Sequence, residues 1–424
     1  MIKVLEAFSG IGAQAKALER LNIEHKIIAT ADWDVNAIMA YDLIHHGKQD
    51  LSPYMSMSKQ QILKELSQYT LSPDGKNPYK EGVLERKNVE ELRRLLCAIR
   101  RTNNLVSITD MTSENIPEDL DLLTYSFPCQ DLSIAGVWHG NMSGIDRNAN
   151  NRSGMLWEVE RILKECVEKG QRIPKFLLME NVSNIMAPRH MENFQEWIDY
   201  LKEIGYYSKI YRLNASKFGI PQIRERVFML SIYIGNSEEK KKLLEAYLLT
   251  HNLENEEYCS TLPLRQISVS DIIKCDYSRD TYRMEANISQ LNDTPSRQRI
   301  IQENDKILQD GIYTNVLKTI TTKQDRNPNS GVIEYNNPCE GKVNWRYLTA
   351  RECFLAMGFD ECDYEILMKH NYNIAKNRKL FSESKLIKMA GNSIVVNVLE
   401  AIFMQVIEIK ELLDNSNVVD NLRN

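Results

Sequence analysis

The first 46 residues constrain the fold more than any other stretch, because strand and helix patterns alternate there at close spacing. The apolar strand runs straight into a glycine-containing turn, and the second strand ends at an acidic residue, Asp32. This order is the opening of a doubly wound, mostly parallel α/β sheet. The expected elements are a strand (2–8), a glycine turn (8–12, FSGIG), a helix (13–21), a strand (25–31) and a helix (34–46).

The alternation continues to about residue 235 and defines a first domain, 1–235. Residues 48–104 interrupt it with three prolines and a charged helical run, and we interpret them as an insertion of unknown role. Strand patterns then follow at 105–109 (ending at Asp110), 121–126 and 176–179.

A second domain is expected over 236–345, where the alternation fails and the composition becomes polar and irregular. Regular patterns return over 346–424. An amphipathic helix at about 394–411 in this return segment is expected to complete the first domain.

Charge and cysteine content exclude several classes of protein. With 53 basic and 58 acidic residues, the net charge of −5 argues against a protein that simply coats nucleic acid, although a local basic cleft remains possible. Eight cysteines without a Cys-x-x-Cys pair indicate reduced thiols in a cytosol rather than a disulfide scaffold or a metal site. No signal peptide or membrane span is apparent, so we expect a cytoplasmic protein.

The glycine turn and Asp32 suggest a nucleotide-like ligand. Gly10 and Gly12 let backbone N–H groups approach such a ligand, and Asp32 can accept hydrogen bonds from ribose hydroxyls. This pattern fits NAD and S-adenosylmethionine alike, and a purely structural turn is also compatible with it. Trp33 can stack on an adenine or belong to the core.

Two further strand ends carry reactive groups. Cys129 directly follows the strand 121–126, at the edge where open α/β sheets bind ligands. That position allows the exposure and lowered pKa that a nucleophilic thiol needs, although most single cysteines are small buried side chains. Glu180 ends the strand 176–179, either facing water or sharing the edge with Cys129 as a general acid.

Gln222, Arg224 and Arg226 alternate along an extended segment, which places all three on one face. Two guanidinium groups on one face suit phosphates, base edges or other carbonyl-rich ligands, and a solvated strand edge is the alternative.

Taken together and in this order, the motifs resemble the DNA cytosine-5 methyltransferase family, of the bacterial and phage type. Ala13 stands where this family usually has glycine, and Asp32 stands where it commonly has the longer glutamate. The motifs are FSGIG (8–12), SFPCQDLS (126–133), MENV (179–182), QIRER (222–226), RYLTARE (346–352) and GNSIVVNVLEAI (391–402).

The resemblance implies S-adenosyl-L-methionine as cofactor, with S-adenosyl-L-homocysteine as its product, and no metal. Asp32 would hold the ribose, Trp33 the adenine, Asp110 the adenine amine, and Leu156 would contact the cofactor through its backbone. The implied cofactor residues are Phe8, Gly10, Gly12, Asp32, Trp33, Asp110, Leu156, Asn392 and Ser393.

The resemblance also implies the catalytic roles. Cys129 would be the nucleophile that adds to carbon 6 of a flipped-out cytosine, and Glu180 the acid at the cytosine ring. Arg226 would donate to the cytosine carbonyl, and Arg224 would support Arg226 or Glu180.

Residues 236–345 would then be the target-recognition domain for a specific double-stranded DNA sequence. A restriction endonuclease acting on the same site is a conceivable partner, and a monomer is expected. The candidate DNA contacts are Gln222, Arg297, Arg299, Thr321, Thr322, Lys323, Gln324 and Arg326.

Three other functions are compatible with parts of the sequence. A tRNA cytosine-5 methyltransferase could use the same catalytic scaffold, but the long variable segment favours DNA. An NAD-dependent oxidoreductase would leave Cys129 and Glu180 unexplained. A DNA-binding regulator without catalysis would have no need of either residue.

Overall fold

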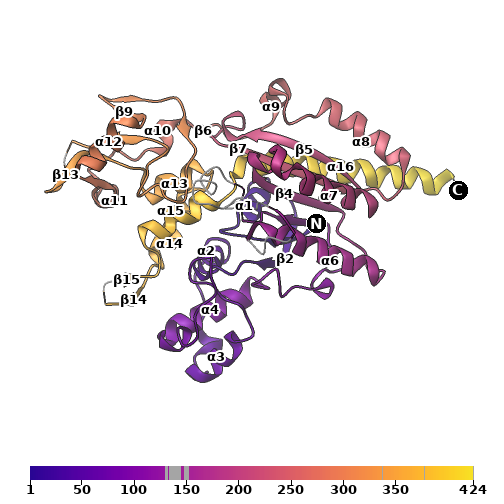
Figure 1. Ribbon diagram of the computed structural model, residues 1–424, viewed down its shortest axis with the longest axis horizontal. Coiled ribbons are helices and arrows are strands. Elements are labelled where there is room, and N and C mark those ends of the chain that lie inside the picture. The colour runs from indigo at the N-terminus through magenta and orange to yellow at the C-terminus, as the bar shows by residue number, and fades with distance from the viewer. Residues whose placement is uncertain (129–131, 133–144, 148–151, 337, 377, 424) are drawn as a thin grey trace.

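A six-stranded sheet forms the centre of the protein. The computed structural model describes residues 1–128, 132, 145–147, 152–336, 338–376 and 378–423 (Figure 1). The strands lie in the order β2-β1-β3-β4-β7-β5. Their bounds are β1 Ile2–Ala7, β2 His25–Ala31, β3 Leu122–Tyr125, β4 Phe176–Val182, β5 Tyr206–Asn214 and β7 Glu225–Tyr233.

The sheet is mostly parallel, as the sequence predicts for the α/β class. Strands β2, β1, β3 and β4 pair in parallel, whereas β7 runs antiparallel to both β4 and β5. Continuous apolar sequence in β3 and in the first part of β4 fits strands that are covered on both faces.

Helices cover both faces of the sheet and create two separate hydrophobic cores. On one face, side chains of α1, α2 and α16 pack against strand residues such as Val4 and Leu178; on the other, α6 and α7 pack against Leu5 and Leu177. The helices are α1 Ala13–Arg20, α2 Val35–His46, α6 Leu156–Glu168, α7 Pro188–Glu203 and α16 Val396–Arg423, with short turns η3 Ser113–Asn115, η4 Arg152–Met155, η5 Ser183–Met186 and η6 Ala215–Lys217.

The strand predicted over 105–109 is wrong. Only Asn104 forms a bridge to β2, through Thr30, and the chain then turns at Ser107–Asp110. Val106 has a positive φ of 63°, which a strand does not tolerate, and the Asn104 side chain bonds the backbone N–H of Val106. Asp110 therefore lies in a turn rather than at a strand end.

The 48–104 segment forms a small helical unit beside α2. Buried leucines of α4, among them Leu92 and Leu96, join the same core as α2 and α3. Its elements are η1 Ser52–Tyr54, α3 Lys59–Leu66, η2 Leu84–Arg86 and α4 Val89–Arg101.

A second sheet, in the order β10-β9-β12-β13-β8, lies apart from the first (Figure 1). Its short strands explain why the sequence of this region looks irregular. The elements are α10 Val269–Ile272, α11 Asp280–Ile288, β8 Gln290–Asn292, α12 Pro295–Glu303, β9 Lys306–Gln309, β10 Ile312–Tyr313, β12 Val332–Glu334 and β13 Lys342–Arg346.

The start of the predicted 236–345 domain belongs with the first sheet instead. Helix α8 Glu238–Thr250 lies along α16, and helix α9 Glu256–Thr261 follows it beside η6 (Figure 1). Tyr247 of α8 donates to Glu408 at 2.5 Å, and Gln405 donates to the His251 carbonyl at 2.7 Å. The boundary set at residue 236 by composition alone is therefore too early.

The return segment connects the two sheets. Residues 383–415 contain a stretch long and apolar enough to span a membrane by length and composition, but 78% of that window is buried within the protein, as expected for a core helix. Helix α16 begins at Val396, close to the predicted 394, and extends past the predicted end at 411. The other elements are α13 Ala350–Ala356, α14 Glu361–Lys369, β14 Asn373–Ala375, β15 Arg378–Lys379 and α15 Glu383–Asn392.

Candidate active site

The turn after β1 has the backbone geometry that its glycines predict. Gly10 and Gly12 have φ values of 56° and 79°, and Phe8 adopts φ 58° despite its side chain. A Cβ on Gly12 would lie 2.1 Å from Nε2 of His45, so only glycine fits there. Nε2 of His45, a residue of α2, lies 3.1 Å from the Ile11 carbonyl, within hydrogen-bond distance. This contact fixes the turn against α2.

Asp32 lies directly beside this turn. Its carboxylate accepts the N–H of Gly10 at 2.9 Å and the N–H of Asp34 at 2.8 Å. Burial, reinforced by the charge of Asp34, raises the pKa of Asp32 to about 6. Each carboxylate oxygen keeps a further lone pair for a ligand hydroxyl. Trp33 follows it, half-buried against the core.

Glu180 and Arg226 form an ion pair at the carboxyl end of β4. Antiparallel pairing of β4 and β7 places Val182 opposite Arg226, and Arg226 Nε lies 3.4 Å from Glu180 Oε1. The Glu180 and Arg226 side chains are only 13% and 18% exposed. Burial raises the pKa of Glu180, while the charges of Arg226 and Arg224 partly lower it. A carboxyl group in this setting is suited to hold a proton.

Cys129 lies outside the described residues, but its neighbours on both sides are tied to the exit of β4. Asn181 donates to the Phe127 carbonyl at 3.1 Å, and Asn184 donates to the Leu132 carbonyl. Ser126 and Glu180 also line one small cavity. Phe127 and Leu132, on either side of the undescribed Cys129, are therefore anchored at the strand end that carries Glu180.

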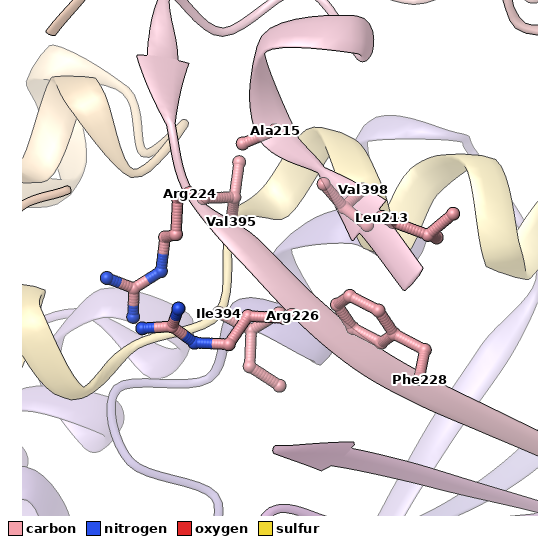
Figure 2. A pocket seen from close by; sticks show the side chains of 8 residues that line it. All are labelled: Leu213, Ala215, Arg224, Arg226, Phe228, Ile394, Val395 and Val398. Carbon is pink, nitrogen blue, oxygen red and sulfur yellow. The ribbon is translucent and has the colours of Figure 1, made fainter. Parts of the chain in front are cut away.

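Arg224 points the same way as Arg226, beside Ile394 (Figure 2). Its hydrogen bonds, however, run to backbone carbonyls: Nη1 donates to Ile320 at 2.9 Å, and Nη2 donates to Gly391 at 3.0 Å and to Ser393 at 2.9 Å. Its charge still acts on Glu180, as the pKa of that carboxyl reflects.

The remaining cofactor candidates have different environments. Asp110 is exposed in its turn, whereas Leu156 is fully buried at the start of α6. Asn392 is exposed as the last residue of α15, and Ser393 directly after it is buried.

The structure brings the two predicted DNA-contact segments together. Arg297 of α12 donates to the Arg326 carbonyl, so α12 lies against the 321–326 segment. Arg299, Lys323 and Arg326 are exposed there, and Thr321 and Thr322 are half-buried.

Two predicted DNA contacts, Gln222 and Gln324, are instead structural in this arrangement. Gln222 is fully buried and bonds Ala356 and Ile320, while Gln324 is fully buried and bonds Ser330. A buried amide with satisfied bonds is not available to a base edge.

Three residues of the site were missed by sequence reasoning. Asn104 accepts the N–H of Asp32, and Lys388 donates to Asp34 at 3.1 Å. Both residues lie far along the chain from their partners, so no sequence pattern indicates these contacts. Asn181 stands next to Glu180, and its position at a strand end was the available signal. Within the described ranges, no three His, Cys, Asp or Glu side chains gather as metal ligands.

Comparison with known proteins agrees with this geometry. A family model described as C-5 cytosine-specific DNA methylase matches residues 76–408. The match includes the Glu180 and Arg226 strand ends and the whole second sheet. The glycine turn at 8–12 precedes it.

Relatives and solved structures extend the likeness along the chain. The orphan methyltransferase M.SssI of Spiroplasma monobiae is 32% identical, covering 95% of this chain and 96% of its own. The type II methyltransferase M2.ScrFI of Lactococcus lactis subsp. cremoris is 30% identical, covering 96% and 99%.

The fold itself is shared with the Dnmt2 methyltransferase of S. pombe, at a TM-score of 0.59 and 17% identity. That match covers 96% of this chain and 99% of the other. The Entamoeba histolytica methyltransferase EhMeth has a TM-score of 0.55 at 16% identity, with 96% and 98% covered. The protein thus belongs to the C-5 cytosine-specific DNA methylases and is an enzyme of that family.

Proposed function

We propose that the enzyme transfers a methyl group from S-adenosylmethionine to carbon 5 of a flipped-out cytosine in a specific double-stranded DNA sequence. The observation that carries this proposal is the buried Glu180–Arg226 pair at the strand end to which Asn181 ties Phe127, two residues before Cys129. An acid and a cation are gathered at this edge, and we propose Cys129 as the nucleophile that acts beside them.

The side chains divide the chemistry among them. The Cys129 thiolate adds to carbon 6, and this addition makes carbon 5 nucleophilic. Glu180, whose pKa burial raises, donates a proton or hydrogen bond to ring N3 and so neutralises the developing negative charge. Arg226 donates to the exocyclic oxygen in a site that excludes most water. Once carbon 5 has accepted the methyl group, loss of the carbon 5 proton expels Cys129 and releases 5-methylcytosine.

The turn after β1 fits S-adenosylmethionine, which supplies the methyl group from its sulfonium centre. A Cβ on Gly10 would meet no described atom within 4 Å, so the turn leaves open space beside its backbone, and Asp32 retains lone pairs for the ribose hydroxyls. The half-buried indole of Trp33 offers a face for the adenine. We assign Asn392 and Ser393 to the closing side of this pocket, and Asp110 and Leu156 to its outer and inner walls.

The domain with the second sheet supplies target recognition. Exposed Arg299, Lys323 and Arg326 are gathered around α12 and the 321–326 segment, and such side chains suit phosphates and guanine edges. Local positive charge of this kind is compatible with a net charge of −5. We further propose that the protein is a cytoplasmic monomer. A restriction endonuclease can act on the same DNA target sequence as its partner.

Labelled S-adenosylmethionine offered with plasmid DNA or with tRNA tests this function. We expect label in DNA at carbon 5 of cytosine, and bisulfite sequencing of the product gives the target site. Label confined to tRNA would overturn the substrate assignment. Cys129→Ser should abolish transfer while S-adenosylhomocysteine still binds in calorimetry. Full activity of that variant would remove Cys129 from its proposed role.

A further inference from the structure

The junction between the two domains contains a connection that the chemistry above does not use. Strand β6 (Gln222–Ile223) pairs in parallel with β11 (Leu317–Lys318), and Thr319 donates to the Ile223 carbonyl at 2.6 Å. Strand β6 leads directly into β7, which carries Arg226, and β11 leads into the predicted DNA-contact segment. The two functional regions therefore meet at β6.

Arg224 lies at the centre of this junction. It is 4% exposed, and one nitrogen of its guanidinium bonds the Ile320 carbonyl, directly before Thr321. Its other terminal nitrogen bonds the carbonyls of Gly391 and Ser393, on either side of Asn392. One rigid, planar group thus holds the recognition segment and the cofactor-closing segment at the same time.

The two segments also contact each other without any side chain between them. A Cβ built on Gly391 would lie 2.6 Å from the backbone of both Thr321 and Thr322. Helix α15 ends here, at Asn392, and the negative end of its dipole faces the Arg224 charge. Because the contact is backbone against backbone, a shift of one segment must displace the other.

We propose that Arg224 is a positioning residue that couples cofactor binding to DNA binding across the domain junction. The coupling rests on the proposed function, since it assigns Asn392 and Ser393 to the cofactor and 321–326 to DNA. Ordering of either segment by its ligand favours the arrangement in which Arg224 reaches all three carbonyls. By linkage, each ligand then raises the affinity for the other by the same factor.

The test variant is Arg224→Lys. It keeps the positive charge, but its single ammonium nitrogen replaces the two terminal nitrogens of the guanidinium. The dissociation constant of a fluorescein-labelled plasmid fragment is measured with and without saturating S-adenosylhomocysteine. In the wild type we expect DNA binding to tighten by about 5- to 150-fold, the usual range of such couplings. In Arg224→Lys this factor should fall toward 1, and the same should hold for Gly391→Ala.

The control is Arg100→Lys, the same change at an exposed ion pair on α4, which should keep the wild-type factor. An unchanged factor in Arg224→Lys, with both ligands still bound, would overturn the proposal. Equal weakening of both single-ligand affinities at a constant factor would also overturn it, because that result indicates a merely structural role. The assay uses S-adenosylhomocysteine, which has no methyl group to transfer, so its result does not depend on catalysis. Failure of the proposed chemistry is detected separately, in the methylation assay.

Discussion

Glu6 gives a quantitative prediction about stability. It lies on β1, shortly before the glycine turn, with no exposed surface. Neither carboxyl oxygen has a hydrogen bond of normal geometry within the described structure, although Tyr41 and the backbone of Ala15 are near enough to lower its pKa in part. Burial dominates and raises the pKa of Glu6 from 4.5 to about 7.

The sign of the effect follows from proton binding. A raised pKa means that the folded protein binds more protons than the unfolded chain, so stability is greatest at low pH and is lost as the pH rises from 4.5 through 7. A rise to about 7 corresponds to about 3 kcal/mol in total, at about 1.4 kcal/mol for each pH unit. About 2 kcal/mol of this should be lost between about pH 5.5 and 8.5.

Glu6→Gln removes the titration and keeps the shape. Urea unfolding of wild type and variant at several pH values measures the difference in their free energies of unfolding. The variant should gain about 2 kcal/mol relative to wild type across that pH range. Glu81→Gln, at an exposed position, controls for the chemical change itself. A Glu6→Gln difference that is constant with pH would refute the reasoning, whatever its size.

Three further substitutions test the site and the domain junction. Glu180→Gln should lower the methylation rate by about 10²- to 10⁴-fold in the labelled-methyl assay, because the amide cannot supply the proton. Gly12→Ala, which combines φ 79° with a clash against His45, should abolish S-adenosylhomocysteine binding in calorimetry. Glu352→Gln leaves fully buried Arg346 without its charge partner and should cost about 3–5 kcal/mol of stability in denaturant unfolding.

Features set by local sequence were predictable. Glycines before a helix predicted the positive-φ turn, and an acidic strand end predicted Asp32 beside it, because both depend on backbone geometry over a few residues. Alternation likewise placed Arg224 and Arg226 on one face (Figure 2).

Features set by long-range contacts, or by local contacts that the residue pattern does not reveal, were not predictable. The partners of Arg224 lie 96, 167 and 169 residues away, so its polar sequence context could not indicate a buried clamp. Gln324 stands in a polar, exposed-looking stretch, yet a local bond to Ser330 buries it. The strand expected at 105–109 failed because apolar residues alone do not reveal the left-handed turn at Val106.

The central claim is that Cys129 attacks cytosine in DNA, and covalent trapping tests it most directly. The enzyme is incubated with S-adenosylmethionine and duplex DNA in which 5-fluorocytosine replaces cytosine, and the products are separated under denaturing conditions. Fluorine cannot leave carbon 5 as a cation, so we predict a denaturation-resistant protein–DNA adduct that maps to Cys129 by mass spectrometry and is absent in Cys129→Ser. Turnover on normal DNA without any such adduct, or an adduct at another residue, would contradict the mechanism.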